Sequence, residues 1–290
     1  MQNENFSAPE ETPGGYNFGT FAGVYTPALL TILGLVMFMR TNFVLGNAGL
    51  FQTLLILLVG SSITLATGFS ISAIATNTDV GGGGAYYLIS RVLGPAFGTS
   101  IGLTLFVSQS LAIPFNILGA TEAIIDGWPE LRPYFPLVNV ALGAILFFFV
   151  WKGADWAIRA QFFIMAVLGV SVIVFLAGPL GNFSLENLRA NWGPLDTVHS
   201  LIPCFAIFFP AVTGIMAGVN MSGDLRDPHR SIPRGTFYAL GTAVVLYLIQ
   251  IIIAAGCFNR QDMIAYPYVL LTKNALFGLG FMVLAGVLAA

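Results

Sequence analysis

Seven apolar runs of about membrane-spanning length constrain this chain more than any other feature of its sequence. A helix needs roughly 20 apolar residues to cross the hydrocarbon core of a bilayer. The chain is 57% hydrophobic and 8% charged, whereas soluble domains carry roughly 25% charged residues. We therefore predict an all-α integral membrane protein with spans over residues 21–48, 50–75, 97–125, 136–151, 157–178, 200–220 and 236–257, and an eighth apolar run that begins near Leu276.

The sequence predicts two regions. Residues 1–19 are polar and acidic, without the basic and apolar regions of a signal peptide, and are expected to form a disordered cytoplasmic tail. Residues 20–290 are expected to form one transmembrane domain. An arginine-rich segment, 222–234, is expected to be a solvated inner loop; it favours a cytoplasmic N-terminus in a multi-pass protein of the plasma or inner membrane. The net charge of −2 offers nucleic acid no basic face, so the expected surroundings are lipid.

Two of the apolar runs are interrupted where an unpaired backbone group is most costly. In residues 208–220, FFPAVTGIMAGVN, Pro210 cannot donate a backbone hydrogen bond, and Thr213-Gly214 follows directly. In the first run, Pro27 and Gly34 flank Thr31. One interpretation is an ordinary kink whose freed carbonyls bond a neighbouring hydroxyl. The other is a pair of discontinuous helices at matching places in two repeats, which is typical of the midplane site of a transporter.

Discontinuous helices present backbone ligands of both signs. The half-helix that begins at a break has free N–H groups and a positive dipole end, which suit an anion. The half-helix that ends there has free carbonyls, which suit a sodium or potassium ion. No acidic or basic side chain lies close to Thr213 in sequence. A site for both ions can therefore be built from backbone dipoles and one hydroxyl.

Four stretches of the chain resemble the cation–chloride cotransporters, a branch of the amino acid–polyamine–organocation superfamily. They are LLTILGLVMFMRTNFVLGNAGL (29–50), GGGAYYLISRVLGPAFGTSIGL (82–103), FAIFFPAVTGIMAGVN (205–220) and SGDLRDPHRSIPRGT (222–236). The resemblance runs from about Gly23 to the last residue. It implies the LeuT-type inverted-repeat fold, with discontinuous first and sixth helices. The glycine-rich stretch is less specific, because amino-acid permeases carry similar glycines.

The resemblance also implies a role for individual residues. Potassium would be held by the carbonyls of Thr31, Ile32 and Pro210 and by the hydroxyl of Thr213. Sodium, in relatives that use it, would take carbonyls at Leu30 and Leu33. Chloride would rest at two places, on the amides of Gly34, Leu35 and Val36 and on those of Gly214, Ile215 and Met216.

Three positions depart from the pattern of the family. Asn116 stands where the potassium-carrying members have a tyrosine that completes the potassium shell, so the choice of cation stays open. Thr31 replaces an asparagine, and Leu33 stands where sodium-dependent relatives often have tryptophan. Because the expected ligand at Thr31 is a main-chain carbonyl, that change matters less.

Arg40 and Glu122 are ionisable residues at the expected outer ends of apolar runs. Each can be interpreted as snorkelling to the lipid headgroups. The alternative, which the resemblance supports, is an ion pair that closes the outer vestibule.

The leading functional prediction is symport of chloride with Na⁺, K⁺ or both by alternating access. One alternative is an amino-acid or amine permease on the same fold. Another is a truncated component that does not transport, because the chain ends inside the expected eighth helix and leaves the second repeat incomplete. No pattern of nucleophile and base or of clustered metal ligands indicates an enzyme or a bound cofactor. Whether the chain pairs as a homodimer stays open.

Overall fold

The computed structural model describes residues 18–78, 80–151, 154–194 and 201–289. Most of the expected tail, residues 1–17, lies outside the described residues. The described chain is almost entirely helical, which confirms the predicted all-α class. It contains seven helical spans long and apolar enough to cross a membrane: Phe21–Met39, Thr41–Asn77, Pro95–Gly127, Pro129–Phe149, Ala160–Asn182, Leu201–Asn220 and Pro228–Cys257.

The first span is discontinuous, as the sequence predicted, but it ends earlier than expected. It consists of a π-helical turn and two short helices, η1 (Phe21–Tyr25), α1 (Thr26–Ile32) and α2 (Leu35–Met39). Arg40 leaves the helical region, and α3 (Thr41–Asn77) starts directly after it. Within α3, Gly49 adopts a φ of 76° that side-chain-bearing residues avoid, so the helix kinks there. The expected boundary near residue 49 is therefore this kink, and the turn between the two spans lies at Arg40.

The middle of the chain follows the hydropathy pattern, with one helix that the pattern missed. That helix is α4 (Gly84–Leu93), which is amphipathic and too short to cross a bilayer. The longer helices are α5 (Pro95–Gly127), α6 (Phe135–Trp151) and α7 (Ala154–Ala177). Short elements connect them onward, namely η2 (Pro129–Tyr134), η3 (Gly178–Asn182) and α8 (Leu185–Ala190).

The sixth span is also discontinuous, as predicted. It comprises α9 (Leu201–Phe208), the 3₁₀ turn η4 (Phe209–Val212) and α10 (Met216–Asn220). A short turn, η5 (Ser222–Asp224), leads to the uninterrupted helix α11 (Pro228–Cys257). The last described elements are α12 (Arg260–Ala265), α13 (Pro267–Lys273), η6 (Leu276–Gly278) and α14 (Gly280–Ala289).

The expected inner loop over residues 222–234 is largely helical, which corrects that prediction. Asp227 caps α11, because its Oδ1 accepts a hydrogen bond of 3.2 Å from the backbone N–H of Arg230. Pro228 then occupies the first helical position, where its missing N–H costs nothing. With these two residues, α11 begins at Pro228, eight residues before the predicted span over residues 236–257.

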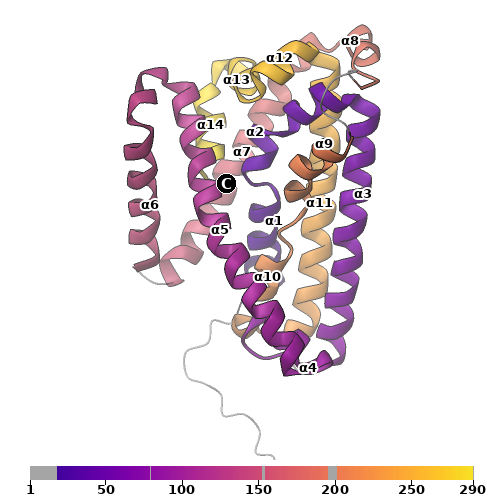
Figure 1. The fold of residues 1–290 in the computed structure, drawn as a ribbon, viewed down its shortest axis with the longest axis vertical. Helices are drawn as coiled ribbons and strands as arrows, with labels where there is room; N and C mark the ends of the chain where they lie inside the picture. Colours follow the sequence, from indigo (N-terminus) through magenta and orange to yellow (C-terminus); the bar gives the residue numbers. More distant parts are fainter. Residues whose placement is uncertain (1–17, 79, 152–153, 195–200, 290) are drawn as a thin grey trace, which may run out of the picture.

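The two discontinuous spans lie at the centre of the molecule. Figure 1 shows α1 and α2 between α5 on one side and α11 and α3 on the other, with α9 and α10 beside them. In the most apolar part of the first span 67% of the residues are buried, against 0% in the corresponding part of α5. The first span is thus packed against protein over most of its length, which an interrupted backbone requires in lipid.

At the α4 end of the molecule, the residues before the first span join the turn after the sixth. Phe18 and Leu225 form a parallel β-bridge. The N–H of Phe18 donates to the carbonyl of Asp224, and the N–H of Arg226 donates to the carbonyl of Phe18, both at 3.0 Å. Close by, Thr20 and Ser231 are linked through their hydroxyls at 3.2 Å. The start of the first span is therefore fixed to the end of the sixth.

At the opposite end, Asn191 joins α3 to α11. Its carbonyl accepts a hydrogen bond of 2.7 Å from the N–H of Leu50, which the kink at Gly49 frees. Its buried side-chain Nδ2 donates to the carbonyls of Ala255 and Phe258, at 2.8 and 3.0 Å, and so satisfies the last turn of α11. One residue thus pairs backbone groups of two spans.

We expect Asn191→Ala to destabilise the chain by about 2 kcal/mol, because two buried carbonyls lose their donor. The measurement is the thermal unfolding of the purified protein in detergent, with Asn182→Ala, at an exposed position, as the matched control. Equal unfolding midpoints for the two variants would contradict this role of Asn191.

Candidate functional site

The first break separates α1 from α2 at Leu33 and Gly34. The N–H of Leu33 still bonds the carbonyl of Leu29 at 2.8 Å, but Gly34 is extended, with φ −73° and ψ −163°. The next N–H bonded within the second half-helix is that of Met37, which donates to the carbonyl of Gly34 at 3.1 Å. The amides of Gly34, Leu35 and Val36 therefore precede the first internal bond of α2, as the first amides of any helix do.

The second break has the same form. Thr213 is extended, and Gly214 has a φ of 111°. The N–H of Ala217 donates to the carbonyl of Gly214 at 3.1 Å. The amides of Gly214, Ile215 and Met216 consequently have no intrahelical acceptor.

The two breaks touch each other. A Cβ at Gly214 would lie 2.8 Å from Cγ2 of Thr31 and 3.3 Å from the backbone nitrogen of Ile32. Glycine is therefore required at this position both for its positive φ and for the close approach of the other chain segment. The ends of α1 and η4 and the starts of α2 and α10 thus meet in one small region.

Several of the expected cation ligands are paired within the protein. The hydroxyl of Thr213 donates to the carbonyl of Pro210 at 2.8 Å, and the N–H of Thr213 approaches the same oxygen at 3.3 Å. At Thr31 the expected ligand is the carbonyl; the hydroxyl of this residue donates to the carbonyl of Pro27 at 2.8 Å. The donating hydroxyl of Thr213 keeps lone pairs that can accept a cation. The carbonyl of Pro210 already accepts two hydrogen bonds, so it would bind a cation by giving up one of them.

The remaining expected ligands differ in their surroundings. The side chains of Leu30 and Leu33 are apolar and buried. Only the backbone carbonyls of these residues can bind a cation. Asn116 is exposed on α5, and its Nδ2 donates to the carbonyl of Ala112 at 2.9 Å. Gly119, three residues further along the same helix, lies against the side chain of Leu35. Asn116 is thus on the face of α5 that turns toward the first break.

Arg40 and Glu122 form an ion pair at the α12 end of the breaks. Nη2 of Arg40 lies 3.0 Å from Oε2 of Glu122, and the two side chains are 42% and 43% exposed. Arg40 belongs to the turn between α2 and α3, while Glu122 is near the end of α5. The pair therefore links the second half of the first span to α5. At this exposure, water and salt screen its attraction substantially.

Near this pair lies a buried tyrosine that the sequence did not single out. Tyr268 of α13 is 2% exposed, and its hydroxyl has no hydrogen-bond partner among the described residues. Burial, and to a smaller degree the negative charge of Asp126, raises the pKa of Tyr268 above its ordinary value. The phenol is therefore neutral at physiological pH.

Two further polar side chains that the sequence analysis did not single out lie on α11. Tyr247 and Gln250 are buried, and each donates a hydrogen bond to the first span, to the carbonyls of Ile32 and Met37 respectively. A tyrosine and a glutamine inside the apolar run AVVLYLIQIII could have signalled a polar contact at membrane depth. Nothing in the sequence indicates which helix they reach.

A cavity of about 440 Å³ lies between α4, α5 and the end of α10. Its lining includes Tyr86 of α4, Gln109 and Ser110 of α5, and Asn220 at the end of α10. Since α10 begins at the second break and ends in this cavity, it connects the region of the breaks with the α4 end of the molecule.

Comparisons with known proteins agree with the resemblance seen in the sequence. A family model described as amino acid permease matches residues 23–290. Solute carrier family 12 member 1 of Mus musculus is 36% identical over 272 residues, which cover 87% of this chain and 25% of that protein. Member 2 of the same family from Danio rerio is 35% identical over 273 residues, or 87% of this chain and 24% of the relative.

Member 3 from Mus musculus is 33% identical over 285 residues, which cover 90% of this chain and 28% of that protein. The chain thus spans about a quarter of the length of the curated relatives it matches. These similarities confirm the expected resemblance to the cation–chloride cotransporters and agree with a LeuT-type architecture. The chain belongs to the amino acid permease family.

Proposed function

We propose that this chain carries the ion site of a symporter that moves chloride together with Na⁺, K⁺ or both. The observation that supports this most is the contact between the two breaks, which gathers carbonyl ends and amide ends of four short helices in one region. Such a region can bind a cation and an anion side by side without any charged side chain, because helix ends supply partial charges of both signs. The relatives from solute carrier family 12 agree with this proposal.

The cation is proposed to bind the carbonyls of Thr31, Ile32 and Pro210 and the hydroxyl of Thr213. Asn116 is proposed as a further ligand, since an amide oxygen accepts a cation and its face of α5 turns toward the break. The carbonyls of Leu30 and Leu33 are proposed for sodium. Leu30 and Leu33 both lie near the end of α1.

Chloride is proposed to bind the amides at the start of the two second half-helices. One set comprises Gly34, Leu35 and Val36, and the other comprises Gly214, Ile215 and Met216. Cation and anion then neutralise each other's charge, which lowers the cost of holding either ion at membrane depth.

Alternating access is proposed to occur around these breaks. Arg40 and Glu122 are proposed as the gate on one side of the membrane, and the cavity at the end of α10 as the route to the other side. The arginines at residues 226, 230 and 234 lie near the α4 end, which supports a cytoplasmic N-terminus in a plasma or inner membrane. The α12 end, with the Arg40–Glu122 pair, would then face outward. We also propose that the protein acts in transport and not as an enzyme, with no cofactor beyond its ions.

The match to an amino acid permease model favours a second candidate, a permease whose substrate carboxylate uses the same helix starts. Uptake by the full chain in proteoliposomes separates the two functions. We expect uptake of labelled chloride that requires external Na⁺ or K⁺, and no chloride-dependent uptake of neutral amino acids. Amino-acid uptake that is insensitive to chloride would favour the permease.

Thr213→Val tests the cation ligand set. Valine fits the extended backbone of Thr213 but removes the hydroxyl, so we expect the half-saturating cation concentration to rise about tenfold or more. Thr213→Ser keeps the hydroxyl and is the matched control. The readout is cation-dependent chloride uptake, and an unchanged half-saturating concentration in the valine variant would rule out a ligand role.

Charge exchange tests the proposed gate. We expect Arg40→Glu and Glu122→Arg each to reduce transport several-fold, since either replaces the ion pair by two like charges at the same place. The double exchange restores the opposite charges and should recover part of the lost rate. Arg132→Glu, at an exposed position near the same end, controls for the change in net charge. A double variant no better than the singles argues against pairing.

A further inference from the structure

Helix α11 contacts both sides of the first break through buried polar side chains. The hydroxyl of Tyr247 donates to the carbonyl of Ile32 at 3.0 Å, and Nε2 of Gln250 donates to the carbonyl of Met37 at 2.9 Å. Tyr247 is 0% exposed and Gln250 is 2% exposed. Ile32 is the last residue of α1, whereas Met37 lies in α2. The two hydrogen bonds therefore join the two half-helices to one continuous helix.

The spacing of the two donors matches this arrangement. Residues three apart lie on the same face of a helix, about 4.5 Å apart along its axis at about 1.5 Å per residue. Helix α11 runs from Pro228 to Cys257 without a break, and its only internal proline is near its start, at residue 233. It can thus hold Ile32 of α1 and Met37 of α2 at a fixed distance from each other. The extended backbone of Gly34 between them would not fix this distance by itself.

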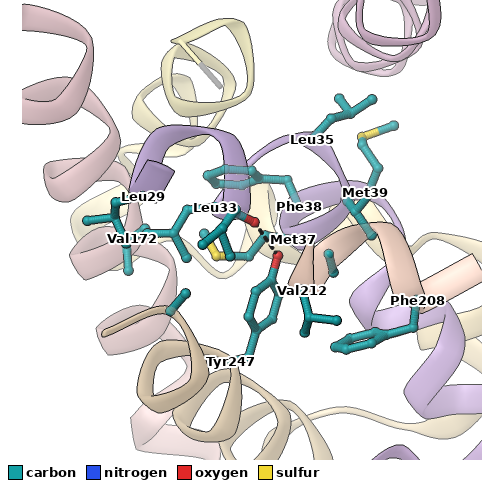
Figure 2. Packing of buried hydrophobic residues seen from close by; sticks show 14 of the residues in the cluster. Leu29, Leu33, Leu35, Met37, Phe38, Met39, Val172, Phe208, Val212 and Tyr247 are labelled. Atoms are coloured by element: carbon teal, nitrogen blue, oxygen red, sulfur yellow. Dashed lines mark hydrogen bonds between the residues drawn. The ribbon is translucent and has the colours of Figure 1, made fainter. Parts of the chain in front are cut away.

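Tyr247 also contacts the second discontinuous span. Its ring packs edge-on against that of Phe208, with centroids 5.5 Å apart and an interplanar angle of 67°. Phe208 is the last residue of α9, immediately before the turn that leads to the second break. Figure 2 shows Tyr247 between Phe208 and Val212 on one side and Leu33 and Met37 on the other, with its hydroxyl pointing at the first span. This single side chain therefore touches both interrupted spans.

We propose that Tyr247 and Gln250 are positioning residues for the ion site, an inference that rests on the proposed function. Tyr247 fixes the direction of the Ile32 carbonyl by occupying one of its two lone pairs, and leaves the other for a cation. Gln250 fixes α2 through Met37, and so fixes the amides of Gly34, Leu35 and Val36 where chloride is proposed to bind. Neither side chain needs to touch an ion.

A bond that only stabilises the fold and a bond that positions ligands differ in their dependence on ions. A structural bond raises the unfolding midpoint equally with and without ions. A positioning bond changes how much ion is needed to raise the midpoint, because ligand binding to the native state stabilises it according to the ratio of ligand concentration to Kd. The two roles can therefore be separated by titration.

The test is the thermal unfolding of the full chain in detergent, with potassium gluconate and choline chloride titrated separately against a constant concentration of the other ion. Tyr247→Phe keeps the ring and removes the hydroxyl. We expect it to need about fivefold more potassium for the same rise in midpoint, with the chloride requirement unchanged. We expect Gln250→Met to need about fivefold more chloride, with the potassium requirement unchanged.

Two matched controls define the background. Tyr238→Phe makes the same chemical change on an exposed part of α11, and Gln261→Met makes it at an exposed position of α12. Both should leave the ion titrations unchanged. If Tyr247→Phe and Gln250→Met lower only the ion-free midpoint, or shift both ions equally, the positioning role is wrong. A wild-type chain whose midpoint rises with none of potassium, chloride and sodium, the last titrated as its gluconate, contradicts the proposed ion site itself.

Discussion

The structure depends on the need to pair every backbone N–H and carbonyl inside an apolar surrounding. Helices meet this need within themselves, and a break in a helix transfers it to whatever lies nearby. Here the nearby groups come from other spans. Tyr247 serves the carbonyl of Ile32 at the first break, and Gln250 serves the carbonyl of Met37 near the end of α2. The hydroxyl of Thr64 serves the carbonyl of Val212 at the second break, at 2.8 Å. The central position of the two interrupted spans follows from this requirement.

The sequence predicted the elements that depend on composition and failed on those that depend on contacts. The interrupted spans were predictable, since proline and glycine inside an apolar run weaken a continuous helix. The early start of α11 was not, because a polar cap at Asp227 decided it and hydropathy does not register caps. The break at Arg40 was likewise hidden inside an apolar run, and α4 was too short and amphipathic to stand out.

The candidate site shows the same division. Its backbone ligands were predicted from the breaks and from the resemblance, and their roles remain proposals. The supporting side chains of α11 were not predicted, because the partner of a buried tyrosine is set by tertiary packing. Asn116 was singled out by the resemblance alone, and its role as a ligand is a proposal. Its Nδ2 donates to the carbonyl of Ala112 in its own helix, which leaves its Oδ1 as the group that could accept a cation.

The bridge between Phe18 and Leu225 has a mechanical consequence. It ties the chain ahead of α1 to the turn that follows α10, while Gly214 packs against Thr31 at the other ends of the same two half-helices. Two half-helices joined at both ends tilt together, because an independent tilt of either one would break the bridge or the contact at Gly214. A displacement of the backbone at Phe18 would then be transmitted along the half-helices to both breaks at once.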